Sequence, residues 1–146
     1  MLIAYFSWSG NTRGAALEIQ RQTGADLIEI DCDILYSESE PTKPELMIQI
    51  DDVAKYDVIF LGYPNWWASV PLHIALFLEK FNFSGKTIVP FCSHGGGRFG
   101  HSLTAIAKLA PGATLGKALA IYYAGGPKLS DEISLWLGQN NISPVT

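Results

Sequence analysis

The fold is decided by one stretch near the N-terminus, Leu2-Ile3-Ala4-Tyr5-Phe6-Ser7-Trp8-Ser9-Gly10-Asn11-Thr12. The apolar run at 2–6 predicts a buried strand. From residue 12 the apolar residues change to helical spacing, with Ala15, Ala16 and Ile19 on one side. Hydroxyls, an amide side chain and one glycine separate the two segments, with no acid and no lysine among them. The stretch therefore predicts a strand that leads through a short polar loop into a helix.

This loop has the composition of an anion-binding turn. The first N–H groups of a helix lack partners within the helix and carry the positive end of its dipole, so a phosphate can satisfy both. Ser7, Ser9 and Thr12 can add hydroxyl donors, and Gly10 lets the backbone close around a ligand. The alternative is an ordinary helix capped by serine or asparagine.

Composition places limits on the class of protein. The 146 residues predict one domain, 1–146, and the charged fraction of 16% beside 48% apolar residues suits a sheet covered on both faces, or an oligomer. The net charge is −4 without a basic block, so we expect no nucleic-acid partner.

The sequence shows neither a membrane-targeting segment nor a cysteine motif. The chain enters its first strand without a cationic leader region, and no apolar run approaches the roughly 20 residues of a membrane span, so we expect no membrane partner. Cys32 and Cys92 lack the spacing of a metal or redox motif, so we expect both thiols to be reduced in a cytoplasmic protein without a metal site.

Strands and helices are predicted to alternate along the chain. Apolar runs predict strands at 2–6, 26–31, 57–62, 87–92 and 118–122, and helical patterns predict helices at 12–22, 69–80, 101–110 and 130–139. Such alternation indicates a parallel sheet with right-handed crossovers. Segment 32–52 contains Pro41 and Pro44 and reads as a loop, with a short helix feasible only at 45–54.

Three unusual loops follow the first, third and fourth predicted strands. In an open parallel sheet these loops meet at the carboxyl edge, where ligands bind at the point of reversal in strand order. The second loop is Pro64-Asn65-Trp66-Trp67 and the third is Ser93-His94-Gly95-Gly96-Gly97-Arg98-Phe99-Gly100. A phosphate site, an aromatic platform and a glycine-rich backbone together suit a planar heterocycle that carries a phosphate. The alternative for Trp66 and Trp67 is that they cap the core.

These motifs resemble the flavodoxin-like flavoproteins, and most of all the short bacterial members with a Pro-x-Trp-Trp loop. The resemblance covers nearly the whole chain. It implies an α/β three-layer sandwich with a five-stranded parallel sheet in the order 2-1-3-4-5, and it implies noncovalent FMN. Two departures are Ala68, where such loops often have glycine, and segment 32–52, where members carry a substantial helix, so that helix two is expected to be short or missing.

The resemblance also implies where the cofactor lies. Its phosphate would be held at 7–12, and its isoalloxazine would lie between the loops at 64–67 and 93–100. The expected cofactor-binding residues are Ser7, Trp8, Ser9, Gly10, Asn11, Thr12, Pro64, Asn65, Trp66, Trp67, Ser93, His94, Gly95, Gly96, Gly97 and Gly100. No residue is predicted to act as a catalytic acid or base.

Competing motifs are weaker. The pattern Gly95-x-Gly97-x-x-Gly100 matches a dinucleotide fingerprint, but it follows the fourth strand and no acid occurs at 101–130. A nucleophile elbow, a P-loop and the acids of a receiver domain are missing from the sequence. A serine hydrolase that uses His73, His94 or His101 stays open, although His73 is expected at the surface or its boundary and Cys92 in the core.

The predicted function is that of an FMN-dependent electron carrier between redox partner proteins. An FMN-dependent NAD(P)H oxidoreductase of the quinone or flavin reductase type is the alternative, and a non-redox phosphate- or nucleotide-binding module is a second one. Arg98 is the one arginine in the three loops, with Arg13 on the first helix. The apolar residues Leu46, Met47, Ile48 and Ile50 either fold back over the sheet or meet a second subunit, and we favour a homodimer.

Overall fold

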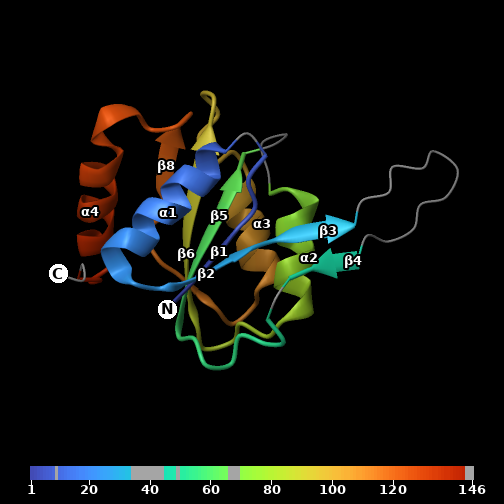
Figure 1. The fold of residues 1–146 in the computed structure, drawn as a ribbon. Coiled ribbons are helices and arrows are strands. Elements are labelled where there is room, and N and C mark those ends of the chain that lie inside the picture. The colour runs from blue at the N-terminus through green and yellow to red at the C-terminus, as the bar shows by residue number, and fades with distance from the viewer. Residues whose placement is uncertain (9, 34–44, 49, 66–69, 144–146) are drawn as a thin grey trace, which may run out of the picture.

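A central parallel sheet organises the chain. The computed structural model describes residues 1–8, 10–33, 45–48, 50–65 and 70–143 (Figure 1). The sheet has the order β2-β1-β5-β6-β7, and β8 also pairs with β6. Its strands are β1 (Leu2–Tyr5), β2 (Asp26–Glu29), β5 (Val58–Pro64), β6 (Thr87–His94), β7 (Thr114–Leu115) and β8 (Leu119–Tyr122). The predicted parallel order 2-1-3-4-5 is confirmed.

The fifth position of the sheet is shared by two short strands. β7 pairs with the start of β6 and β8 with its end, so the predicted strand at 118–122 is only the second half of this position. Between them the backbone of Lys117 donates to Asn140 Oδ1 at 2.9 Å and accepts from Trp136 Nε1 at 2.6 Å. Side chains in and just after the last helix therefore satisfy the peptide groups that leave the sheet.

Helices cover both faces of this sheet (Figure 1). One face carries α1 (Asn11–Thr23) and α4 (Leu129–Gln139), and the other carries α2 (Leu72–Lys80) and α3 (Ser102–Leu109). A short 3₁₀ helix, η1 (Gly126–Lys128), leads into α4. Each face has its own apolar cluster, with Ile19, Phe60 and Trp136 on the α1 side and Ile59, Phe77 and Ile88 on the α2 side. The predicted three-layer sandwich is confirmed.

Most helix and strand ends agree with the sequence. α1 ends where Gly24 adopts φ +69°, a left-handed conformation that suits glycine after a helix. β5 and β6 each end two residues later than predicted, because their mutual ladder continues from Gly62↔Phe91 to Pro64↔Ser93. Pro71, predicted within the first turn of its helix, is instead the residue before α2.

An antiparallel pair of strands lies where the resemblance noted in the sequence implies a second helix. β3 (Asp31–Asp33) pairs antiparallel with β4 (Glu45–Met47), and among the described residues no helix lies between β2 and β5. The short helix considered at 45–54 is therefore wrong. Leu46, Ile48 and Ile50 alternate with a period of two, which suits a strand rather than a helix.

This hairpin segment supplies part of the missing cover. Ile48 and Ile50 are partly buried and pack against the cluster that contains Ile30 and Val53, on the face that α2 and α3 cover. Two of the four apolar residues considered for a subunit contact thus fold back onto their own sheet.

No helix in the described part of the chain has the length and hydropathy that a membrane span needs.

Candidate functional site

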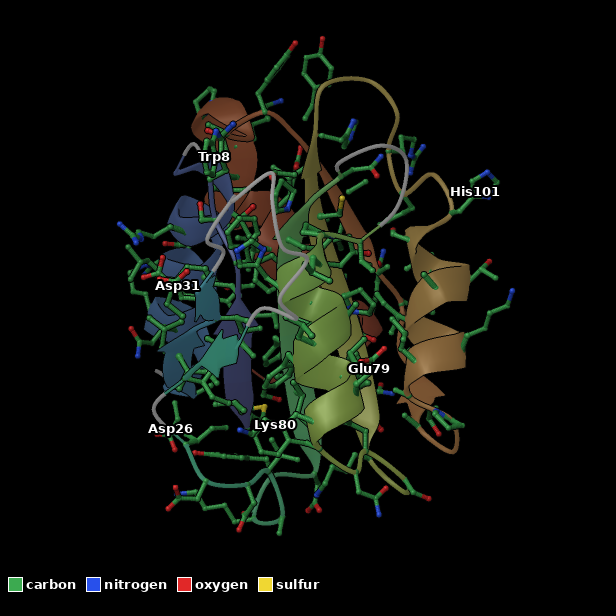
Figure 2. All side chains as sticks on the ribbon, turned by 90° about the vertical axis from the view of Figure 1, so that its right-hand side faces the viewer. Trp8, Asp26, Asp31, Glu79, Lys80 and His101 are labelled. Atoms are coloured by element: carbon green, nitrogen blue, oxygen red, sulfur yellow. The ribbon has the colours of Figure 1, made fainter. Side chains whose placement is uncertain are left out.

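The loops singled out in the sequence share one edge of the sheet. β1, β5, β6 and β8 run parallel, so the segments that follow them emerge at the same end. In Figure 2, Trp8 and His101 lie at this end, whereas Asp26 and Lys80 lie at the opposite end. Ser9, Trp66 and Trp67 fall outside the described residues, so their predicted cofactor contacts stay predictions.

The β1–α1 turn presents backbone donors at a helix start. Gly10 precedes α1 with φ +95°, a conformation that L side chains rarely adopt. Ser7 Oγ accepts the N–H groups of Gly10 and Arg13, each at 3.2 Å, and keeps its own hydroxyl hydrogen to donate. Among the described residues, none accepts a hydrogen bond from the N–H of Asn11 or Thr12.

These groups suit an anion. Two N–H groups without an acceptor in the described chain lie beside one hydroxyl at the positive end of α1, and the first turn of that helix contains no acid. A phosphate monoester could accept from all three donors. This is the arrangement that the sequence predicts for the cofactor phosphate.

The hydroxyl of Thr12 has a second role. Thr12 Oγ1 and Ser93 Oγ lie 2.8 Å apart, and both residues are buried. The pair joins the start of α1 to the end of β6, two elements that the sequence assigns to different parts of the site. A hydroxyl can accept one hydrogen bond and donate another, so Thr12 can still serve a phosphate while it remains bonded to Ser93.

The two arginines near the site differ in their partners. The guanidinium of Arg13 contacts both carboxylate oxygens of Glu29 at 2.8 and 2.9 Å. Hydrogen bonds to Tyr5 and to Glu29 raise the pKa of Arg13. Arg98 forms no ion pair among the described residues. Arg98 is therefore the arginine at this edge whose charge is open to a ligand.

Asn65 connects the second loop to the third. Its backbone N–H donates to Ser93 O at 2.9 Å, and its Nδ2 donates to Arg98 O at 2.7 Å. Its Oδ1 is buried, and no described group donates to it. A buried acceptor without a donor costs stability, so Oδ1 is suited to an N–H of a bound molecule.

The glycine-rich loop exposes its backbone. Gly95, Gly96 and Gly97 are all exposed, and Gly96 has φ +133°. His94 Nδ1 accepts the N–H of Gly96 at 3.0 Å, which places the proton of the neutral ring on Nε2. Burial, and then the charge of Arg98, lower the pKa of His94. The loop thus offers a neutral imidazole as a hydrogen-bond donor.

Two tyrosines complete the edge, and the sequence analysis did not assign them to the site. Tyr122, the last residue of β8, is 60% exposed, and Tyr123, which follows it, is 54% exposed. Trp8 is 77% exposed on the first loop. Tyr123 also has φ +52°, and its N–H donates to His94 O at 2.8 Å. Their place at the end of a parallel strand was the signal that could have identified them.

His73 is buried, and the prediction that it lies at the surface or its boundary is wrong. It is 7% exposed and stacks on Phe6 with ring centroids 3.8 Å apart. The helix that carries it is buried along a broad face, so the imidazole packs as an aromatic ring. Burial lowers the pKa of His73.

Neither a hydrolase nor a metal site is found in the described part of the chain. No serine hydroxyl there is hydrogen-bonded to a histidine, and the hydroxyls of Ser93 and Ser102 pair with Thr12 and Tyr63 instead. No group of three or more histidine, cysteine or acidic side chains is placed to hold a metal ion among those residues. As predicted, Cys92 is buried in the core, and burial raises the pKa of its thiol to about 12.

Comparison with known proteins agrees with this architecture. A candidate flavoprotein from Bacteroides eggerthii is 28% identical, with 97% of this chain and 98% of that chain covered and a TM-score of 0.80. A second, from Bacteroides uniformis, is 27% identical, with 91% and 96% covered and a TM-score of 0.76. A flavoprotein in complex with FMN from Lactobacillus acidophilus is 19% identical, with 92% and 96% covered and a TM-score of 0.69, and shows the same fold.

The sequence itself gives the family. The comparison with curated proteins gives no match. A family model described as flavodoxin matches residues 1–138, which include all three loops of the site. The chain therefore belongs to the flavodoxin family.

Proposed function

We propose that this protein binds FMN at the carboxyl edge of its sheet and carries electrons between redox partner proteins. The observation that carries the proposal is the pair of N–H groups of Asn11 and Thr12, which lie at a helix start beside the Ser7 hydroxyl without an acceptor among the described residues. Family membership supports FMN as the cofactor, and so does the related fold that was solved in complex with FMN.

Residues of three loops would contact different parts of FMN. Ser7, Asn11 and Thr12 would hold the phosphate, Asn65 would accept a hydrogen bond through Oδ1, and the exposed backbone at 95–97 would line the ring system. Bound FMN supplies the redox chemistry itself. The protein then contributes position, shielding from water and the charge of Arg98 near the loop.

The scarcity of cations favours an electron carrier over a nicotinamide-dependent reductase. A reductase must also hold a dinucleotide, and small-molecule sites combine several convergent polar groups. Here Arg13 is held by Glu29, and His94 is kept neutral, which leaves Arg98 as the open charge among the described loop residues. An NAD(P)H oxidoreductase of the quinone or flavin reductase type is the second candidate, because that one guanidinium could contact a nucleotide phosphate.

One spectrum and one mixing experiment test this function. Purified protein should be yellow with flavin absorbance bands, and a colourless protein that cannot be reconstituted with FMN would indicate a phosphate- or nucleotide-binding module instead. Anaerobic mixing with excess NADH or NADPH should bleach the flavin slowly or not at all. Bleaching within seconds at micromolar nicotinamide would make the protein a reductase, with Arg98 the first residue to change.

Location and assembly remain part of the proposal. A cytoplasmic location would fit a carrier that exchanges electrons with proteins and that contacts neither a membrane nor nucleic acid. A homodimer stays part of the proposal, although Ile48 and Ile50, two of the four residues considered for it, pack on their own sheet. Light scattering that gives only a monomer mass at high concentration would contradict a stable dimer.

A further inference from the structure

A pocket of about 340 Å³ lies beside the glycine-rich loop, at the edge strand β8. Its lining comes from β6, β8, the loops that follow them and the first turns of α4: His94, Arg98, Ala120, Tyr122, Gly125 and Glu132. None of these residues belongs to the β1–α1 turn or to the loop after β5. His94 and Arg98 belong to the loop assigned to the flavin ring, whereas Ala120, Gly125 and Glu132 were not assigned to the cofactor, so the pocket extends from that loop along β8 to α4.

Strand register builds one wall of this pocket. His94 and Tyr122 are partners in the parallel ladder between β6 and β8, and their ring centroids lie 5.7 Å apart at 72°. Ala120 lies on the same face of β8 as Tyr122, because side chains alternate along a strand. The wall therefore consists of a tyrosine ring, a small residue and an imidazole.

The pocket carries two opposite charges that do not neutralise each other. Arg98 and Glu132 both line it, and no ion pair joins them in the described part of the chain. The neutral His94 ring adds a donor, since its Nδ1 is occupied by the N–H of Gly96 and its proton is on Nε2. A guanidinium and an imidazole N–H can thus meet a carboxylate, while Glu132 remains to meet a cation.

The backbone at Arg98 is held in a strained conformation. Arg98 has φ +51°, and its carbonyl accepts hydrogen bonds from Asn65 Nδ2 at 2.7 Å and from the Cys92 thiol at 3.6 Å. The carbonyl is thereby fixed toward β5, while the side chain lines the pocket. Strained residues persist where the surrounding structure holds them, and they concentrate at ligand sites.

We propose that this pocket binds a small zwitterion, of which an α-amino acid with an apolar side chain is the simplest example. Its carboxylate would meet Arg98 and His94 Nε2, its ammonium group Glu132, and its apolar part the ring of Tyr122. The volume lies near the lower end of the roughly 300–1,000 Å³ of small-molecule sites. A simple anion would leave Glu132 without a partner, and a simple cation would face Arg98. Because His94 and Arg98 also border the proposed flavin site, binding in this pocket is measured separately from FMN affinity.

Three small molecules test the contributions of the ligand's carboxylate and ammonium groups one at a time. The ¹⁵N-labelled protein, as purified, is titrated with L-phenylalanine, with 3-phenylpropionate, which lacks the amine, and with phenethylamine, which lacks the carboxylate. L-phenylalanine should shift the amides of Tyr122, Gly125 and Glu132 saturably, and each singly charged probe should bind at least about tenfold more weakly, as expected when a charged hydrogen bond is lost. Equal binding of 3-phenylpropionate, or no saturable shift, would overturn the proposal.

A matched pair of variants tests the residue assignment. Glu132→Gln should weaken binding of L-phenylalanine about tenfold, whereas 3-phenylpropionate should bind as well as before or more tightly, because a negative charge is removed from the pocket. Asp131→Asn is the control, because Asp131 is exposed in the same first turn of α4 but does not line the pocket. FMN affinity, measured separately, should be unchanged in both variants. An equal loss of L-phenylalanine binding in Asp131→Asn would show a general charge effect and would refute the assignment to this pocket.

Discussion

The two ends of the parallel sheet differ in how their polar groups and backbone are held. At the end where the strands begin, polar groups are paired: Tyr56 Oη donates to Asp26 at 2.6 Å, and Lys86 Nζ donates to Tyr56 O at 2.6 Å. Three phenylalanines pack nearby, with the ring of Phe77 5.4 Å from that of Phe81 and 5.5 Å from that of Phe83. We refer to this end as the amino end.

The opposite, carboxyl end is less completely satisfied. Asn65 Oδ1 and His73 Nδ1 are buried there without a partner among the described residues. Arg98 and Tyr123, two of the three non-glycine residues with positive φ in the described part of the chain, also lie at this end. We infer that the amino end supplies stability and the carboxyl end holds ligands at some cost to stability. Variants at the amino end should therefore change mainly stability, and variants at the carboxyl end mainly binding.

The largest effect is expected at the amino end. Phe77 is fully buried, so Phe77→Ala should lower the free energy of unfolding by about 3–5 kcal/mol. FMN affinity of the folded fraction should stay unchanged. Leu72→Ala, on the same helix but 47% exposed, is the control and should change stability by about 0.5 kcal/mol or less. Urea unfolding measures both, and weaker FMN binding in folded Phe77→Ala would break the division between the two ends.

The next largest effect is expected at the β1–α1 turn, the proposed phosphate site. Ser7→Ala removes the acceptor of two N–H groups and a donor to phosphate, so stability should fall by about 1 kcal/mol and FMN affinity about tenfold. Riboflavin affinity should be unchanged, because riboflavin lacks the phosphate. Thr104→Ala, an exposed hydroxyl on α3, is the control. A parallel loss of riboflavin binding would mean that Ser7 acts on the ring and not on the phosphate.

A smaller effect is expected in the aromatic loop. Trp66→Ala and Trp67→Ala, made one at a time, should leave folding largely intact and weaken FMN binding in at least one case. Loss of stacking is worth about 0.5–1.5 kcal/mol beyond buried area. Fluorescence titration of each apoprotein with FMN measures it. Normal affinity in both variants would remove the stacking role assigned to this loop.

The smallest effect is expected in how the free energy of unfolding changes at low pH. The pKa values of His73 and His94 are lowered in the folded protein, chiefly by burial, so the unfolded chain binds protons more readily. The stability that their neutral forms contribute is complete above the ordinary histidine pKa of about 6.5 and is lost as the pH falls below it toward the lowered values. Urea unfolding at pH 7.5 and 5.5 should show this loss, and His73→Phe, which keeps a ring against Phe6, should reduce it. An undiminished loss in His73→Phe would exclude His73 as a source.

The sequence predicted the sheet and the edge at which its polar and glycine-rich loops meet, because both depend on local signals. Apolar runs identify the strands, and polar residues after them identify the loops that parallel strands bring together. The hairpin of β3 and β4 was missed, because three-residue strands carry too little periodicity. β7, with two residues, was missed for the same reason.

Side-chain partners were harder to predict, because they join segments that are distant in sequence. The hydroxyl pair of Thr12 and Ser93 spans 81 positions, and the carbonyl of Arg98 that Asn65 contacts lies 33 positions away. The burial of His73 depends on Phe6, which a helical pattern around residue 73 does not reveal. These contacts follow from how the elements pack and not from the pattern of any one of them.

The central claim is that the start of α1 holds the phosphate of FMN. Calorimetric titration of the apoprotein with FMN and with riboflavin tests it directly, with the amide signals of Asn11 and Thr12 followed by NMR in the same samples. FMN should bind at least about tenfold more tightly than riboflavin, and only FMN should shift both amides strongly, since charged hydrogen bonds to phosphate are lost with riboflavin. Equal affinities with both amides unmoved would contradict the account.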